Sequence, residues 1–260
     1  MPIGGNYFIY NGVASRTYGL MFAYVNTTNQ NAAVEGTREY LTSKLPRGDR
    51  YMILGRQPDG PYACEVEIIS ETPLTAARQR ELVRWLFYRP DYAKLKILSP
   101  EYEGVYYSCI LTDETAIMAG DGCHGWKCTL QCDSGFAWEE PKTAVYENLV
   151  SGSIIEFENT SDEIGYLKPD VTLTVGDCDT VQIQNVEDNN NMVRFEQVAQ
   201  GYQIHMDEWG QITGTPESVH WYGRYNHRRL FLVNGVNHLA ITGEIARLEI
   251  AYQNKRRIGL

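Results

Sequence analysis

The sequence predicts a mainly β protein with an α+β N-terminal domain, a C-terminal β-sandwich and one principal helix at about residues 73–88. Three observations lead to this fold class. Short runs rich in β-branched and aromatic residues recur along the chain, with turn residues between them. A single segment has the composition of a helix. Beyond residue 150 no helical period is present, and strand-like runs follow one another as in a sandwich.

The composition argues against several classes of function. The 260 residues carry a formal net charge of −10 and include six cysteines. This charge argues against nonspecific binding of nucleic acid, because that needs Lys and Arg to neutralise phosphates. We expect no membrane span and no secretory signal, and therefore a protein made and kept in a cytoplasm until assembly or lysis. The cysteines are too sparse for a disulfide framework, so we expect buried free thiols.

The N-terminal domain is expected to span residues 1–140. Tyr7–Tyr10 predicts a strand before an Asn11-Gly12 turn, and alternating apolar residues predict a second strand at 18–24. The polar stretch at about 27–50 predicts an extended arm or a long loop. It is a candidate for reaching a neighbour, because it has too little apolar content to fold alone.

Later strands in this domain surround the helix. Tyr51–Leu54 and Tyr62–Ile69 bracket a turn-rich linker and predict a hairpin. Leu95–Leu98 and Val105–Thr112 predict two further strands. Strand, hairpin, helix and strands in this order indicate an α+β domain.

The helix at 73–88 is expected to begin with Thr72 as cap and Pro73 in the first turn, and to stop before Pro90. Its apolar residues fall on two faces. The first face should pack on the domain's own sheet, and it comprises Leu82, Trp85 and Leu86. The second face should complete the core or touch a second subunit, which makes interface candidates of Val83 and Phe87.

The C-terminal domain is expected to span residues 150–260. Turn signals separate its strand-like runs at 153–158, 171–175, 180–186, 192–197, 202–206, 230–233, 238–242 and 246–252. Charge is divided within it: 14 acidic and 2 basic residues lie between Glu147 and Glu217, whereas 2 acidic and 7 basic residues follow. Such asymmetry allows subunits to pair head to tail.

Cysteines and a histidine gather at Cys123-His124 and at Cys128 and Cys132. Soft ligands of this kind can bind zinc, but the paired C-x-x-C spacing of structural zinc sites is absent. Trp126, Cys128, Leu130 and Cys132 instead alternate with polar residues, which is what a half-buried strand requires. We therefore expect core cysteines and no metal or cofactor.

The segment at 220–228 joins aromatic and polar side chains. On a sandwich, such a group can stack on a sugar ring, but the same composition is typical of protein interfaces. A carbohydrate-binding adhesion module that uses this cluster is the alternative function. The interface candidates in it are Trp221, Tyr222, Tyr225 and Arg228.

Catalytic signatures are missing. The sequence has no G-x-S-x-G elbow, no H-E-x-x-H and no phosphate or dinucleotide loop. Its many carboxylates could supply a glycosidase pair, but acids this frequent also pair by chance. We expect no catalytic residues and no enzyme activity.

Three segments in order resemble the distal tail protein (Dit) family of bacteriophages with long, non-contractile tails. The opening Phe8–Gly12 and the following Tyr18-Gly19-Leu20 are similar to the family's N-terminal signature. The block at 68–97 is similar to the strand, helix and strand of its ring-forming domain. The stretch at 234–252 resembles its last strands.

This resemblance implies a structural role in the virion at the tail tip, or baseplate. It implies a homohexameric ring formed by the N-terminal domain around a channel that DNA crosses without specific binding. It implies that the C-terminal sandwich is galectin-like in shape and projects outward. The implied partners are the tail tube protein, the tail-tip hub protein and a receptor-binding or other baseplate protein.

Overall fold

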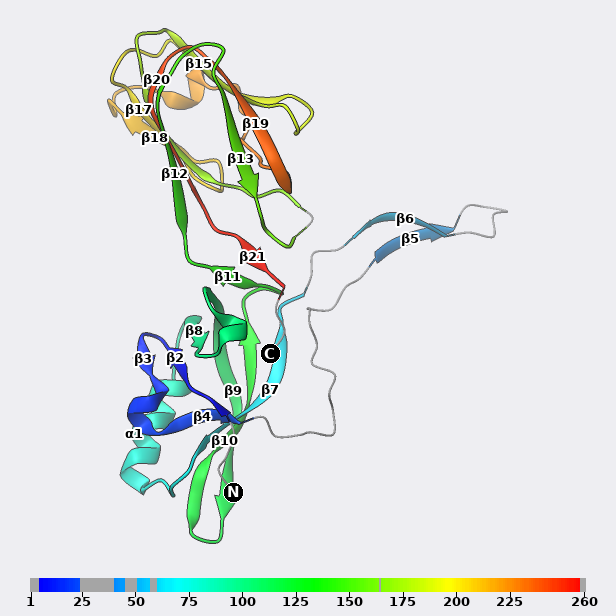
Figure 1. The fold of residues 1–260 in the computed structure, drawn as a ribbon, viewed down its shortest axis with the longest axis vertical. Coiled ribbons are helices and arrows are strands. Elements are labelled where there is room, and N and C mark those ends of the chain that lie inside the picture. The colour runs from blue at the N-terminus through cyan, green and yellow to red at the C-terminus, as the bar shows by residue number, and fades with distance from the viewer. Residues whose placement is uncertain (1–4, 24–39, 45–50, 57–59, 164, 258–260) are drawn as a thin grey trace. The chain divides into compact units, whose positions relative to one another are not determined.

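The computed structural model describes residues 5–23, 40–44, 51–56, 60–163 and 165–257 (Figure 1). These residues are mostly strand and contain one α-helix, α1 (Ala76–Leu86), which confirms the predicted mainly β fold class with one principal helix. The chain divides into two compact units. Unit 1 comprises Met1–Glu139 with Arg256–Leu260, and unit 2 comprises Glu140–Lys255.

Unit 1 is built on one large antiparallel sheet with the strand order β1-β4-β7-β10-β9-β8-β2-β3, which β11 and β21 extend. The strands are β1 (Gly5–Asn6), β2 (Phe8–Tyr10), β3 (Val13–Ala14), β4 (Leu20–Ala23), β7 (Ala63–Ser70), β8 (Ala93–Ile97), β9 (Val105–Ala119), β10 (Gly122–Cys132), β11 (Ala137–Glu139) and β21 (Lys255–Arg256). Two 3-10 turns interrupt them, η1 (Ser15–Tyr18) and η2 (Pro100–Tyr102).

The predicted hairpin between Tyr51–Leu54 and Tyr62–Ile69 is wrong. Strand β6 (Tyr51–Arg56) pairs with β5 (Tyr40–Lys44) in a separate two-stranded sheet. Strand β7 lies between β4 and β10, where its Ile68 is opposite Phe22 and Trp126. Apolar cross-strand pairs of this kind stabilise a sheet, and local turn signals do not reveal them because the partners are distant in sequence. The rest of the predicted arm at 27–50 lies outside the described residues.

The sheet of unit 1 curls until strands far apart in its order meet. Phe8 of β2 and Phe22 of β4 have ring centroids 4.2 Å apart, although β7, β10, β9 and β8 separate them in the strand order. Trp85 of α1 stacks on Phe8 at 6.1 Å, and its indole N–H donates to the Tyr10 carbonyl at 3.2 Å. The helix is thereby fixed over the line where the sheet closes.

Helix α1 begins later than predicted, because the chain before it is held beside β10. The backbone N–H of Leu74 donates to the carbonyl of Cys123 at 2.7 Å, and the Leu74 carbonyl accepts from the Gln79 side chain at 2.8 Å. Pro73 therefore precedes the helix. Thr75, and not Thr72, is the cap, with its hydroxyl accepting the N–H of Arg78 at 3.3 Å.

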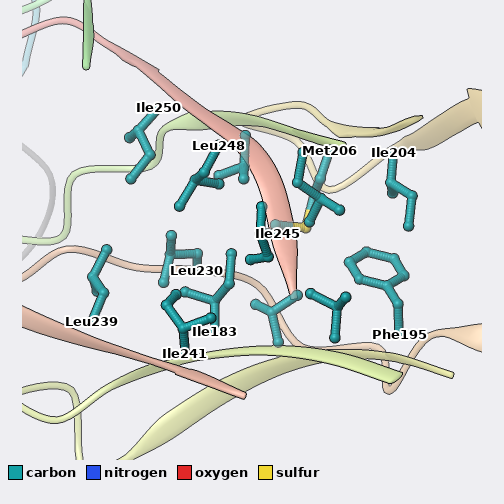
Figure 2. Close-up of a cluster of buried hydrophobic side chains, with 14 of the residues drawn as sticks. Ile183, Phe195, Ile204, Met206, Leu230, Leu239, Ile241, Ile245, Leu248 and Ile250 are labelled. Carbon is teal, nitrogen blue, oxygen red and sulfur yellow. The ribbon is translucent and has the colours of Figure 1, made fainter. Parts of the chain in front are cut away.

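Unit 2 consists of two antiparallel sheets around one core. The first has the order β12-β20-β14-β17-β18, and the second has the order β13-β19-β15-β16. Their strands are β12 (Lys142–Leu149), β13 (Ile154–Asn159), β14 (Asp170–Val175), β15 (Thr180–Asn185), β16 (Asn191–Glu196), β17 (Gln203–Met206), β18 (Ile212–Thr215), β19 (Gly235–Thr242) and β20 (Ile245–Tyr252). Figure 2 shows aliphatic side chains of both sheets facing one another.

Most predicted strands of this sandwich are present, with three differences. β12 occupies residues that we expected to link the domains, and β18 was not predicted. The run at 230–233 forms only an isolated bridge, from Leu232 to Leu167. Leu230 and Leu232 are nevertheless buried. Their apolar pattern therefore indicates that the segment is buried, although the segment is irregular and not a strand.

Buried asparagines hold the start of β19, one of the two central strands of the second sheet. Asn237 is fully buried, and its side-chain oxygen accepts the Val233 N–H and the Asn185 amide, both at 2.8 Å. Its amide donates to the carbonyls of Val233 and Gly235 at 2.9 Å. The side chain thus satisfies backbone groups of Val233, which lies outside the strand, and of Gly235, where β19 begins.

We expect Asn237→Ala to lower the free energy of unfolding by about 2–3 kcal/mol, because the Val233 N–H would lose its buried acceptor. Denaturant unfolding of the purified protein measures this. Val236→Ala is the matched control, because its side chain is 43% exposed and should change stability by less than about 0.5 kcal/mol. Equal losses in the two variants would contradict the role of the Asn237 network.

Candidate interaction surfaces

The inner faces of α1 belong to the core of unit 1. Leu82 and Leu86 are fully buried. Val83 and Phe87 are half-buried and pack against the same cluster, and Phe87 meets Trp126 of β10 edge-on at 6.0 Å. Both interface candidates therefore complete the core. A contact of either one with a second subunit stays a prediction.

The outer face of α1 carries an open groove of about 600 Å³. Arg80 and Arg84 are exposed and stand one turn apart on it, followed by Tyr88, which is 74% exposed. Neither guanidinium has an ion-pair partner within the described part of the chain, whereas Arg78 is bound to Glu81 at 2.9 Å. The groove is lined by Ala76, Gln79, Arg80, Val83, Arg84 and Tyr88.

The segment at 220–228 contains η3 (Trp221–Arg224), and the structure divides its aromatic residues between core and surface. Trp221 is 5% exposed and Tyr225 is 8% exposed, and both belong to the core of unit 2. Tyr225 stacks on Phe195 at 5.1 Å, and its hydroxyl donates to the Arg228 carbonyl. These two rings are therefore core residues and do not form an exposed stacking platform.

Tyr222 and Arg228 are the interface candidates of this segment that reach solvent. The Tyr222 hydroxyl accepts the backbone N–H of Ile212 at 3.2 Å, so this ring is fixed against β18. Asn226 holds the segment to β16, because its oxygen accepts the Arg194 N–H at 3.1 Å and its amide donates to the Met192 carbonyl. Hydrogen bonds thus hold this surface to β16 and β18, but Tyr222 is the one Trp or Tyr ring of the segment that is exposed on it.

The cysteine and histidine run at 123–132 forms β10, as its alternation predicts. Cys128 and Cys132 are buried, and burial raises their pKa to about 12, so these thiols stay protonated and weakly nucleophilic near neutral pH. His124 is engaged elsewhere: Nε2 lies 2.7 Å from Asp121 Oδ1 and Nδ1 lies 3.1 Å from the Ser70 carbonyl. Among the described residues, no three potential ligands converge on a metal-sized site.

Strand β9 continues well beyond the predicted end at Thr112 and forms a long hairpin with β10. Strand β8 pairs with β9 only at Tyr107–Cys109, so the opposite edge of β9 beyond Ile110 has no strand partner in the part of the chain that the structure describes. Sequence reasoning missed this extension because the apolar alternation stops at Leu111. The turn residues Gly120-Asp121-Gly122 were the signal that could have located the hairpin's end.

The described residues contain no helix that is long and apolar enough to cross a membrane.

Comparison with known proteins gives both a family and a fold. Residues 4–134 match the family described as phage tail protein N-terminal domain, and residues 136–252 match the one described as phage tail C-terminal domain. No curated protein is significantly similar to the sequence.

Among solved structures, the fold is similar to that of the Dit (gp 19.1) protein of SPP1, described as a paradigm of the hub adsorption apparatus in phages that infect Gram-positive bacteria. The two chains are 12% identical with a TM-score of 0.67, and the match covers 96% of this chain and 99% of that one. A chain of the phage P2 baseplate in its activated conformation with Ca is 10% identical with a TM-score of 0.44, over 96% of this chain and 98% of that chain.

We expect the His124 and Asp121 pair to stabilise unit 1 within a defined pH window. Hydrogen bonds that the His124 ring donates to Asp121 and to the Ser70 carbonyl raise the pKa of His124 above 6.5, and the same His124 hydrogen bond lowers the pKa of Asp121 below 3.8. The stabilisation should be complete between these two values. It should fall as pH rises through the raised pKa of His124 or drops through the lowered pKa of Asp121.

An NMR titration of the His124 ring measures this directly. Asp121→Asn should bring the pKa of His124 back toward 6.5. An unchanged midpoint in that variant would show that the pair does not form in solution.

Trp221→Ala should lower the free energy of unfolding by about 3–5 kcal/mol, because it opens a cavity in the core of unit 2. Tyr222→Ala should cost only about 1 kcal/mol, the value of one hydrogen bond at an exposed ring. Thermal and denaturant unfolding compare the two variants. A small effect of Trp221→Ala would place that ring at the surface after all.

Proposed function

The chain belongs to the phage tail protein family whose N-terminal and C-terminal domains it matches, and on this basis we propose that it is a distal tail protein, a structural and non-enzymatic component of the tail tip. The observation that carries the proposal is the joint match of both units. The fold likeness to SPP1 Dit extends over 96% of this chain, so it includes unit 1, unit 2 and their order.

We propose further that the N-terminal domain, residues 1–140, forms a homohexameric ring around a channel for DNA. A closed ring uses heterologous contacts, in which each protomer presents two different complementary surfaces. Unit 1 offers such surfaces in the outer face of α1 and the open edge of β9. The net charge of −10 suits a channel that DNA crosses without binding, since a basic wall would retain phosphates.

The C-terminal domain, residues 150–260 and galectin-like in shape, would hold a receptor-binding or other baseplate protein. The remaining partners would be the tail tube protein on one face of the ring and the tail-tip hub protein on the other. The protein would act in the virion, after assembly in the host cytoplasm. Fold alone does not imply sugar binding. Trp221 and Tyr225 are buried, so neither ring is available to stack on a sugar, as the alternative carbohydrate-binding function would require.

We expect the purified full chain to form particles of six times its 29.6 kDa protomer mass, with a central hole and six-fold symmetry. Light scattering measures the mass, and electron microscopy shows the symmetry. Assembly should persist after prolonged incubation without any other tail protein. A protein that remains monomeric at tens of micromolar would contradict the ring.

A further inference from the structure

We propose that the groove on α1 of one copy receives the acidic hairpin of a second copy, and that this contact joins neighbours in the ring. The acidic hairpin is defined as residues 112–121, the distal part of β9 and the turn that follows it. This inference rests on the proposed ring and adds to it which surfaces meet.

The groove is cationic at its rim and apolar at its floor. Arg80 and Arg84 are exposed and lack ion-pair partners among the described residues, and the half-buried Val83 lies between them in the sequence. Tyr88 extends the groove with a ring that is 74% exposed. Arg and Tyr are enriched in protein interfaces, where they combine charge or hydrogen bonding with a large contact area.

The acidic hairpin has the opposite character. It carries Asp113, Glu114 and Asp121 and contains neither Lys nor Arg. Asp113 and Glu114 are exposed, and Met118 has 67% of its surface in solvent. An exposed Met side chain on a strand that also carries exposed carboxylates at Asp113 and Glu114 fits a groove with an apolar floor and guanidinium groups at its rim.

The hairpin is held in a fixed shape before any partner binds. His124 ties Asp121 to the Ser70 carbonyl, and the backbone of Leu74 bonds to Cys123 beside it. The hairpin therefore loses little conformational entropy when it binds a partner, which favours a specific contact. Because the hairpin remains exposed in its own chain, it does not fill that chain's groove.

A second copy is the occupant that these features favour. Both surfaces lie in unit 1 and have opposite charge, and within the described residues Arg80, Arg84 and Glu114 form no ion pair. Each protomer can then donate its hairpin to one neighbour and accept a hairpin from the other, which is the heterologous contact that closes a ring. The open strand edge of β9, which would otherwise invite unspecific pairing, becomes covered in this arrangement.

The test is charge reversal in the full chain, with assembly measured by light scattering and electron microscopy. Arg80→Glu with Arg84→Glu should weaken assembly by about tenfold or more, and Glu114→Arg should do the same from the other surface. Met118→Ser should weaken assembly without lowering the melting temperature of the unassembled protomer, because its side chain is exposed there.

The decisive variant combines Arg84→Glu with Glu114→Arg, which restores the net charge of the wild-type chain. It should recover a substantial part of the assembly that either single change removes. Circular dichroism of each variant checks that the protomer remains folded.

Two outcomes separate this inference from the ring itself. If the wild-type chain forms the ring and the reversed variants form it equally well, or if the charge exchange restores nothing, the groove and hairpin do not meet and only this inference fails. If the wild-type chain stays monomeric, the ring proposal fails with it.

Discussion

The closure of the curled sheet under α1 is the interaction on which unit 1 depends. A sheet that curls leaves its terminal strands without a continuous hydrogen-bonded connection where they meet. Here side chains make that connection: Phe8 and Phe22 touch across it, and Trp85 stacks on Phe8 and donates a hydrogen bond to the backbone carbonyl of Tyr10. The same attachment fixes the outer face of α1, with its two exposed arginines, Arg80 and Arg84, in one orientation relative to the sheet.

Local chemistry made much of this fold predictable. The helix was recognised from composition, and β10 from the alternation of Trp126, Cys128, Leu130 and Cys132, which are all buried. The pairing of β7 with β4 and β10 was not predictable, because register depends on partners far apart in the sequence. The start of α1 was misplaced for a similar reason, since a tertiary hydrogen bond from Leu74 to Cys123 overrides the helix preference of the residues before Thr75.

The candidate surfaces illustrate a harder limit. The aromatic residues at 220–228 have the composition of an interface, yet Trp221 and Tyr225 are core residues and only Tyr222 reaches solvent. Composition cannot distinguish an interface residue from a core residue, because large aromatic side chains stabilise both by burying a large apolar surface area. The hairpin of β9 and β10 shows the opposite error, since a segment without alternating apolar residues proved to extend β9 along β10, with no strand on its other edge in the described part of the chain.

The two ends of unit 2 lie on neighbouring strands. Lys142 of β12 is directly opposite Tyr252 of β20, so the chain enters and leaves the sandwich about one strand spacing apart. A module with adjacent ends can be exchanged for another with adjacent ends without stretching the chain that carries it. Unit 2 therefore has the geometry of an interchangeable domain, which could be replaced by a different domain while unit 1 keeps its curled sheet.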